Sequence, residues 1–226
     1  MSFLEKYLNT VVTAFFMPKL FGFLRKWFWN IFRRKKHLKI GLYGPPNGGK
    51  TTLANRICQD WLGEDMGKVS NIAHETREIQ IKEQIHIKSG NKELSFNLVD
   101  TPGIATKIDY EDFIKAGLSE EEAKKRAKEA TKGVIDAIKW LDEMDVVIVV
   151  LDSTKDPYNQ VNLTIIGNLE ARKIPLLIVA NKIDLKRSNL KRIQSAFPQY
   201  KVVGISAKYG NNIDEFYKAL FEVAGR

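Results

Sequence analysis

The stretch LKIGLYGPPNGGKTT, residues 38–52, decides the fold class of this 226-residue chain. Its first six residues are mainly apolar and predict a buried strand, Leu38–Tyr43. The run GPPNGGKT then stops the strand abruptly, because glycine and proline interrupt regular pairing. Apolar residues at helical spacing follow, so we expect a helix over Thr51–Trp61. The stretch therefore predicts a strand, a glycine-rich loop and a helix in direct succession.

The loop Gly44–Thr51 fits the pattern G-x-x-x-x-G-K-[ST] in the strand-to-helix setting that this pattern requires. Glycines let backbone N–H groups approach phosphate oxygens, and the helix N-terminus adds the positive end of its dipole. Lys50 is then expected to reach the β and γ phosphates, and the Thr51 hydroxyl to bind Mg²⁺. The residues expected around the phosphates are Gly44, Pro45, Pro46, Asn47, Gly48, Gly49, Lys50, Thr51 and Thr52.

From Leu38 onward, short apolar runs alternate with helical patterns. The expected strands are Leu38–Tyr43, Glu78–Lys88, Glu93–Val99, Val146–Leu151, Leu176–Ala180 and Val202–Ile205, with KSGNK as the turn between the second and third. Beyond Trp61, the expected helices lie within Tyr110–Glu143 and over Gln160–Arg172, Asn189–Ala196 and Ile213–Val223. This alternation predicts an α/β fold, with a six-stranded, mostly parallel sheet and helices on both of its faces.

The net charge of +9 is concentrated at the N-terminus. Residues 1–37 hold eight of the 36 basic residues, one of the 27 acidic residues and ten of the 23 aromatic residues. A basic balance points to nucleic acid or to an anionic membrane. The single cysteine, Cys58, excludes an intramolecular disulfide framework and favours a reducing, cytosolic setting. We therefore divide the chain into an N-terminal extension, residues 1–37, and a domain over residues 38–226.

The N-terminal extension shows two amphipathic helical patterns, separated by Pro18. Its longest uncharged run, between Lys6 and Lys19, is shorter than the roughly 18 residues that a membrane-spanning helix needs. We expect the extension to lie on an anionic surface, as the peripheral anchor of a cytoplasmic protein at the inner face of the cell membrane. Two alternatives stay open. The helices bind a protein partner or ribosomal RNA, or they pack on the domain that follows.

The sequence NKID, Asn181–Asp184, predicts which base is bound. It follows the expected strand PLLIVA, and ligands collect at the carboxyl ends of the strands in such sheets. The Asp184 carboxylate can accept hydrogen bonds from the N1–H and the 2-amino group of guanine, and adenine presents neither donor in that arrangement. Buried polar groups left unpaired by the wrong base cost about 1–3 kcal/mol each, so we expect selection of guanine.

Over residues 38–226 the chain resembles the Era-like branch of the translation-factor-related P-loop GTPases. The resemblance rests on the loop Gly44–Thr51, on DTPG (residues 100–103), on NKID and on SAK (residues 206–208), in the order of that family. It adds Asn181, Lys182, Ser206, Ala207 and Lys208 to the expected nucleotide contacts. It also implies that Asp100 holds Mg²⁺ through water and that the Gly103 N–H senses the γ phosphate. Thr76 resembles the first-switch threonine that completes the Mg²⁺ shell, and the alternative is an ordinary loop threonine.

The residue after Gly103 is Ile104, so the glutamine that orients the attacking water in Ras-like proteins is absent there. In several Era-like proteins an asparagine at the position of Asn47 binds a K⁺ ion that takes the role of an arginine finger. The resemblance therefore implies Lys50, Thr76, Gly103 and Asn47 as catalytic residues. The alternatives are that Asn47 only stabilises the loop, and that an activating partner or a nucleotide-dependent homodimer supplies the missing group.

The resemblance implies a GTP-hydrolysing molecular switch that cycles between GTP and GDP and is slow without an activator. Era itself carries an RNA-binding KH domain after its GTPase domain, whereas this sequence ends at Arg226, just past the last expected helix. No KH domain is therefore expected. The functional hypothesis is a switch at the membrane surface with an unidentified effector. Its alternative is an Era-like protein whose N-terminal helices bind a protein or ribosomal RNA during assembly.

Overall fold

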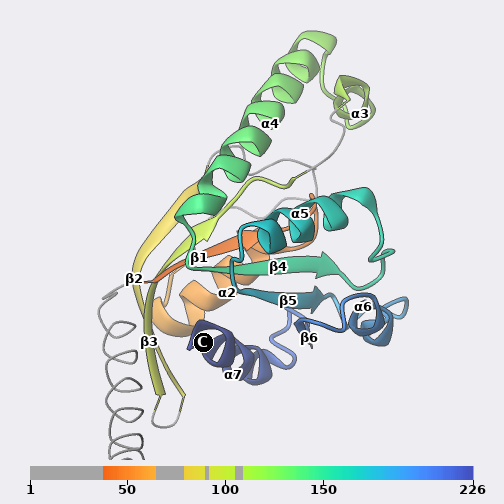
Figure 1. The fold of residues 1–226 in the computed structure, drawn as a ribbon. Helices are drawn as coiled ribbons and strands as arrows, with labels where there is room; N and C mark the ends of the chain where they lie inside the picture. The colour runs from red at the N-terminus through yellow and green to blue at the C-terminus, as the bar shows by residue number, and fades with distance from the viewer. Residues whose placement is uncertain (1–37, 65–78, 90–91, 105–108, 226) are drawn as a thin grey trace, which may run out of the picture. The chain divides into compact units, whose positions relative to one another are not determined.

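A six-stranded sheet with the strand order β2-β3-β1-β4-β5-β6 forms the centre of the domain (Figure 1). The structure is a computed structural model that describes residues 38–64, 79–89, 92–104 and 109–225. The N-terminal extension and Thr76 lie outside the described residues, so the expectations about them stay predictions. Among the described residues, no helix has both the length and the apolar character that a membrane span requires.

Five strands of the sheet run parallel, and β2 pairs antiparallel with β3 at one edge. The strands are β1 (Leu38–Tyr43), β2 (Gln80–Ser89), β3 (Lys92–Asp100), β4 (Val146–Asp152), β5 (Leu176–Asn181) and β6 (Lys201–Ile205). The pairing of β2 with β3 shifts between Lys82 and Ile85, where Gln84 adopts a positive φ of 58°. This bulge lies on the edge strand, where such irregularities are common.

The apolar run VVIVVL makes β4 a central strand. Its residues alternate between the two faces of the sheet, so Ile148 and Val150 enter one core while Val147 and Val149 enter the other. Strand β1 lies between β3 and β4, with Leu42 in register with Asp100 on one side and Ile148 on the other. The loop that follows β1 therefore begins in the middle of the sheet.

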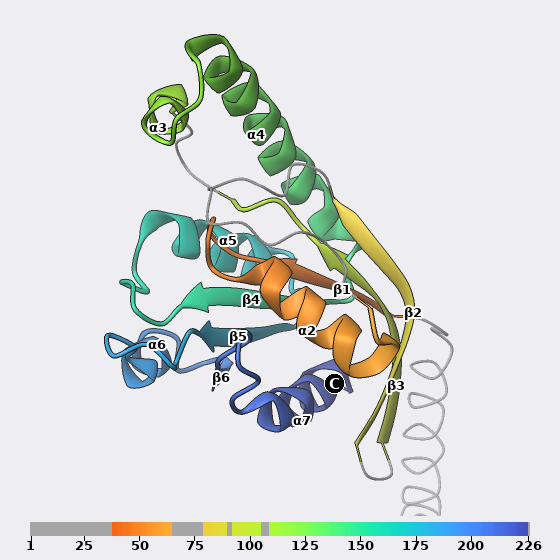
Figure 2. The same cartoon turned by 180° about the vertical axis from the view of Figure 1, so that it is seen from behind.

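Helices cover both faces of the sheet (Figures 1 and 2). The helices are α2 (Lys50–Leu62), α3 (Tyr110–Lys115), α4 (Glu120–Trp140), α5 (Gln160–Ala171), α6 (Leu190–Ala196) and α7 (Ile213–Ala224), with a 3₁₀ turn at Leu141–Glu143. Residues of α2 and α7 share one core, and Cys58 of α2 is buried in it. Residues of α4, α5 and α6 share the core on the opposite face. The α/β fold predicted from the sequence is confirmed.

The expected helical region within Tyr110–Glu143 divides into two helices. Gly117, with a φ of 97°, follows the end of α3, and Ser119 caps α4 through a reciprocal pair of bonds with Glu122. The N-terminal part of α4 packs on α3 around Phe113, while its C-terminal part reaches the sheet core through Ala137. Both views show α3 beside the end of α4 that extends past the sheet (Figures 1 and 2).

Candidate nucleotide-binding site

The glycine-rich loop Gly44–Gly49 joins β1 to α2 at the carboxyl end of the parallel strands. Gly49 is the N-cap of α2 and has a left-handed backbone, with a φ of 96°. A Cβ atom at this position would overlap the side-chain nitrogen of Asn181. Glycine is therefore required here both for the backbone conformation and for the close approach of the Asn181 side chain at the end of β5.

Lys50 lies buried at the start of α2, with its ammonium group directed back at the loop. Its Nζ donates to the carbonyl oxygens of Gly44 at 3.3 Å and Pro45 at 3.1 Å. Burial lowers the pKa of Lys50 to about 8, and the nearby charge of Asp100 acts in the opposite direction. A desolvated cation enclosed by a glycine-rich loop gains a strong partner when a phosphate anion binds.

Thr51 and Asp100 are in hydrogen-bond contact beside Lys50, where the sequence predicts the Mg²⁺ site. The Thr51 hydroxyl donates to Oδ2 of Asp100 at 2.7 Å. Asp100 is fully buried, and its Oδ1 has no hydrogen-bond partner among the described residues. Burial raises the pKa of Asp100, whereas the charge of Lys50 and the hydrogen bond from Thr51 lower it. A hydroxyl and a carboxylate with an unused buried oxygen fit Mg²⁺, which prefers hard oxygen ligands.

The DTPG segment lies directly against the glycine-rich loop. The Thr101 hydroxyl donates to the carbonyl of Leu42 at 2.6 Å, and the Ile104 N–H donates to the carbonyl of Gly44 at 3.1 Å. A Cβ atom on Gly103 would lie 2.8 Å from Cα of Pro46, so a side chain at this position would push the two segments apart. Ile104 is 3% exposed and packs into the core, so its side chain cannot orient an attacking water.

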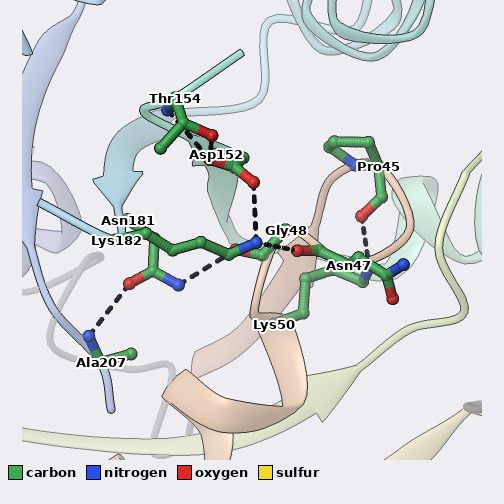
Figure 3. A network of polar contacts seen from close by, with 9 residues as sticks. All are labelled: Pro45, Asn47, Gly48, Lys50, Asp152, Thr154, Asn181, Lys182 and Ala207. Atoms are coloured by element: carbon green, nitrogen blue, oxygen red, sulfur yellow. Dashed lines mark hydrogen bonds and ion pairs between the residues drawn. The ribbon is translucent and has the colours of Figure 1, made fainter. Parts of the chain in front are cut away.

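Asn181, the last residue of β5, joins three of the predicted motifs (Figure 3). Its side-chain nitrogen donates to the carbonyl of Gly48 at 3.0 Å, and its side-chain oxygen accepts from the N–H of Ala207 at 3.0 Å. The residue is 3% exposed, so both bonds are shielded from water. Asn181 thus connects the phosphate loop to the SAK segment.

Lys182 extends from the end of β5 towards the glycine-rich loop (Figure 3). Its Nζ donates to the carbonyl of Asn47 at 2.7 Å and to Oδ2 of Asp152 at 2.7 Å. Asn47 and Lys182 both have positive φ values, 59° and 69°. Asp152 belongs to none of the four motifs, although an acidic residue at the end of the strand VVIVVLD was a signal that could have identified it.

The SAK segment follows β6 and is held by a tight turn and by α2. The Ser206 hydroxyl oxygen accepts from the N–H of Tyr209 at 3.3 Å. Arg56 of α2 donates to the carbonyls of Ala207 at 3.4 Å and Lys208 at 3.2 Å. Arg56 could not be predicted from the sequence as part of the site, because an arginine inside a helical pattern carries no distinguishing signal. Asp184 and Lys208 are exposed, as residues that contact a base at the surface need to be.

The structure thus brings the Gly44–Thr51, DTPG, NKID and SAK motifs to one edge of the sheet, although they span more than 160 residues of sequence. The P-loop lysine, the Thr51–Asp100 pair and the guanine-binding candidate Asp184 all belong to this edge. Thr76 lies outside the described residues, so its role in the magnesium shell is untested. The arrangement is suited to holding a nucleoside triphosphate with its metal ion.

Comparison with known proteins agrees with this geometry. Residues 39–182 match the family described as 50S ribosome-binding GTPase. The chain is 29% identical over 191 residues to the tRNA modification GTPase MnmE of Bordetella petrii, covering 84% of this chain and 34% of that protein. It is 30% identical over 197 residues to the GTPase Der of Mycoplasmopsis agalactiae, covering 83% of this chain and 39% of that protein. The chain therefore spans little more than a third of the length of these relatives.

Solved structures show the same fold. Aquifex aeolicus Era bound to GDP·AlF₄⁻ superposes with a TM-score of 0.63 at 24% identity, covering 83% of this chain and 57% of Era. The FeoB G-domain from Methanococcus jannaschii superposes with a TM-score of 0.51 at 21% identity, covering 84% of this chain and 99% of that domain. Because the family match extends from β1 through the end of β5 and includes the glycine-rich loop, DTPG and the first two residues of NKID, this chain belongs to the 50S ribosome-binding GTPase family and is a P-loop GTPase that binds and hydrolyses GTP.

Proposed function

We propose that this GTPase works as a molecular switch that its N-terminal extension, residues 1–37, holds on the anionic cytoplasmic surface of a membrane. The observation that carries the membrane part is the presence of ten aromatic and eight basic residues in this one segment. Aromatic and aliphatic side chains enter the boundary of the acyl chains, and basic side chains attract anionic head groups. The switch domain is then concentrated at the surface where its effector acts.

Within the site, the residues position the triphosphate and stabilise charge, and they do little covalent chemistry. Loop N–H groups and Lys50 hold the β and γ phosphates, and the Gly103 N–H meets the γ phosphate. Thr51, Asp100 and Thr76 would hold Mg²⁺. Bound there, Mg²⁺ would supply positive charge that offsets the charge of the phosphate oxygens. The buried cation Lys50 is already in place for this role.

Ile104 stands where Ras-like proteins have the glutamine that orients the attacking water. We propose that Asn47 together with K⁺ takes over its catalytic role. Asn47 is exposed at the glycine-rich loop, and its main-chain oxygen is fixed by Lys182 at 2.7 Å. Its side-chain amide oxygen is a hard ligand of the kind that alkali and alkaline-earth cations take. An activating protein or a second copy of the chain, docked in a nucleotide-dependent manner, is the alternative source of the catalytic group.

Flotation of the full chain with vesicles tests the membrane part. Vesicles with anionic lipid are mixed with the protein in GDP or in a non-hydrolysable GTP analogue. We expect the wild type to float, and Trp27→Glu combined with Phe28→Glu to abolish most of this binding. The matched control, Ile135→Glu with Leu163→Glu, adds the same charge at apolar residues of the GTPase domain that are 48% and 47% exposed. This control should float like the wild type.

Salt separates the two contributions to membrane binding. High salt should weaken flotation only in part, because it screens the basic residues and leaves burial of the aromatic residues unaffected. If the wild type ignores anionic vesicles even at low salt, the membrane proposal is wrong.

The description of the family as ribosome-binding favours a second candidate, in which the N-terminal extension binds ribosomal RNA or a protein during assembly. This reading predicts binding of the wild type to ribosomal particles and a loss of that binding with the Trp27 and Phe28 variant. Sedimentation with ribosomes, compared directly with vesicle flotation of the same proteins, distinguishes the two candidates.

A further inference from the structure

We propose that Asp152 is a positioning residue of the nucleotide site, whose carboxylate fixes the Lys182 ammonium so that the NKID segment and the glycine-rich loop are held in the geometry that binds guanine nucleotides. The inference rests on the guanine nucleotide binding of the proposed function and adds a residue that none of the four motifs contains. Asp152 acts through Lys182 and is not a catalytic residue.

The fold places Asp152 and Lys182 side by side. Asp152 ends β4 and is in register with Asn181, the residue before Lys182, on the neighbouring strand β5. The distance between Oδ2 of Asp152 and Nζ of Lys182 is 2.7 Å. The side chain of Asp152 is 11% exposed and that of Lys182 is 30% exposed, so the ion pair is partly shielded from solvent. A pair of this kind is worth more than one on an open surface.

The Asp152 carboxylate is itself fixed in orientation. Its Oδ1 accepts from the Thr154 N–H at 2.9 Å and from the Thr154 hydroxyl at 2.6 Å, which leaves Oδ2 directed at Lys182. Burial raises the pKa of Asp152, but the hydrogen bonds from Lys182 and Thr154 outweigh it and the net pKa is lowered. The carboxylate is therefore a fully engaged anion at neutral pH, and it is a rigid anchor for the ammonium.

The ammonium transmits this anchoring to the phosphate loop. Lys182 also donates to the carbonyl of Asn47 at 2.7 Å, and both residues have left-handed backbones that non-glycine residues seldom adopt. Figure 3 shows the ammonium between the Asp152 carboxylate and the Asn47 carbonyl. Without the carboxylate, one neutral carbonyl remains to orient a long, flexible side chain. Each productive binding event must then order that side chain, which lowers affinity.

A purely electrostatic role for Asp152 predicts the opposite change in nucleotide affinity, so one variant distinguishes the two roles. Asp152 is an anion close to the loop that binds an anionic triphosphate. If it contributed only its charge, Asp152→Asn would tighten nucleotide binding, and it would tighten GTP binding more than GDP binding. If it positions Lys182, the same change weakens both nucleotides, and it weakens them equally because the γ phosphate is not involved.

The experiment measures the affinity of the full chain for GDP and for a non-hydrolysable GTP analogue at constant Mg²⁺. We expect Asp152→Asn to weaken both by about tenfold or more, the loss typical of a hydrogen bond to a charged group. The KM for GTP should rise by the same factor while kcat is unchanged, because the lost contact serves ground state and transition state alike. The matched control is Asp156→Asn, which removes a carboxylate of the same loop that is 56% exposed and pairs with Arg192. This control should bind like the wild type.

Lys182→Met tests whether Asp152 acts through the ammonium. This change keeps an unbranched side chain of similar length and removes the charge, so we expect it alone to weaken binding, and adding Asp152→Asn should cause no further loss. Independent losses that multiply would overturn the proposal, and so would unchanged or tighter binding by Asp152→Asn alone. If the wild type itself bound no guanine nucleotide, the proposed function would fall together with this inference. If only the variant results departed from expectation, the proposed function would stand.

Discussion

At the residue scale, Asn181 shows how one buried amide can hold a nucleotide site together before any nucleotide binds. Its side-chain nitrogen donates a hydrogen bond to the carbonyl of Gly48, and its side-chain oxygen accepts one from the N–H of Ala207. These two partners belong to loops that are far apart in the sequence. Because the residue is buried, water cannot replace either bond when the side chain is removed. The free energy of unfolding therefore reports on this contact directly.

Asn181→Ala should lower the free energy of unfolding of the nucleotide-free protein by about 2–4 kcal/mol, because a buried donor and a buried acceptor lose their partners. Urea denaturation, followed by circular dichroism, gives this value. The matched control is Asn168→Ala on α5, where the residue is half-buried and its side-chain hydrogen bonds are exposed. It should cost less than about 1 kcal/mol. Equal losses in the two variants would contradict the bridging role of Asn181.

Asp184 is expected to select the base. Asp184→Asn should weaken GTP binding by about a hundredfold, since one acceptor of two guanine hydrogen bonds is lost. The same variant should gain affinity for xanthosine triphosphate, because an amide N–H donates to the 2-oxo group where the carboxylate repels it. Competition of the two nucleotides against a labelled GDP measures both changes. Unaltered preference for GTP would show that another group reads the base.

At the element scale, the buried hydroxyl of Tyr43 links strand β1 to helix α4. Tyr43 is fully buried at the end of β1, and its hydroxyl donates to the carbonyl of Ala137 in α4 at 2.9 Å. Burial raises the pKa of Tyr43, so the hydroxyl stays protonated and acts as a donor. The bond ties the strand that precedes the glycine-rich loop to α4, the second helix after the DTPG segment.

Tyr43→Phe removes this bond and little else. We expect the free energy of unfolding to fall by about 1 kcal/mol, the net contribution of one neutral hydrogen bond. Tyr209→Phe is the control. Tyr209 is 62% exposed, so the loss of its hydroxyl should not measurably change the free energy of unfolding. Thermal unfolding of both variants, measured side by side, decides the matter. If Tyr209→Phe lost as much stability as Tyr43→Phe, the hydrogen bond between β1 and α4 would not account for the effect.

The glycine-rich loop carries the prediction about potassium. GTP hydrolysis should be faster in K⁺ than in Na⁺, and Asn47→Ala should remove the difference, because the amide oxygen is the proposed ligand. Steady-state rates in the two salts, at equal ionic strength, measure it. Gln84→Ala, at another exposed residue with a positive φ, controls for a change of backbone preference. Rates that do not depend on the ion would return Asn47 to a structural role in the loop.

The elements of this fold could be predicted from the sequence because each carries a local pattern. The run VVIVVL identifies a buried central strand, and the glycine-rich loop identifies its own flanking strand and helix. The division between α3 and α4 was missed, although Gly117 and the Ser119–Glu122 capping box marked it. The bulge at Gln84 has no such signal, because it depends on how β2 pairs with Asn97 of β3.

Many candidate residues of the site could also be predicted from local patterns, because short motifs identify Lys50, Asp100 and Asp184. Local patterns do not contain the pairing of residues that lie far apart in the sequence. The contact of Lys182 with Asp152 joins residues 30 positions apart, and that of Asn181 with Gly48 joins residues 133 positions apart. Such contacts arise only when parallel strands place their carboxyl ends at one edge.

At the scale of the whole molecule, charge is distributed very unevenly along the chain. Residues 33–36 read RRKK, the densest basic run of the N-terminal extension, and they stand just before β1. Helix α4 also holds several exposed lysines, but acidic residues are interspersed among them. A uniform attraction to anionic surfaces would use both sets of basic residues. The proposed anchor uses only the first.

Replacing Arg33, Arg34, Lys35 and Lys36 by glutamine should weaken binding to anionic vesicles at low salt by two to three orders of magnitude, since each basic residue near such a surface contributes about 1 kcal/mol. Hydrolysis of GTP in the absence of lipid should not change, because these residues are not part of the nucleotide site. The matched control replaces four exposed lysines of α4 (Lys125, Lys128, Lys132 and Lys139) by glutamine, which removes the same charge from the GTPase domain. Flotation with vesicles of graded anionic content compares the three proteins. If both quadruple variants lose binding to the same extent, attraction follows net charge alone, and the extension is not the element that places this GTPase on a membrane.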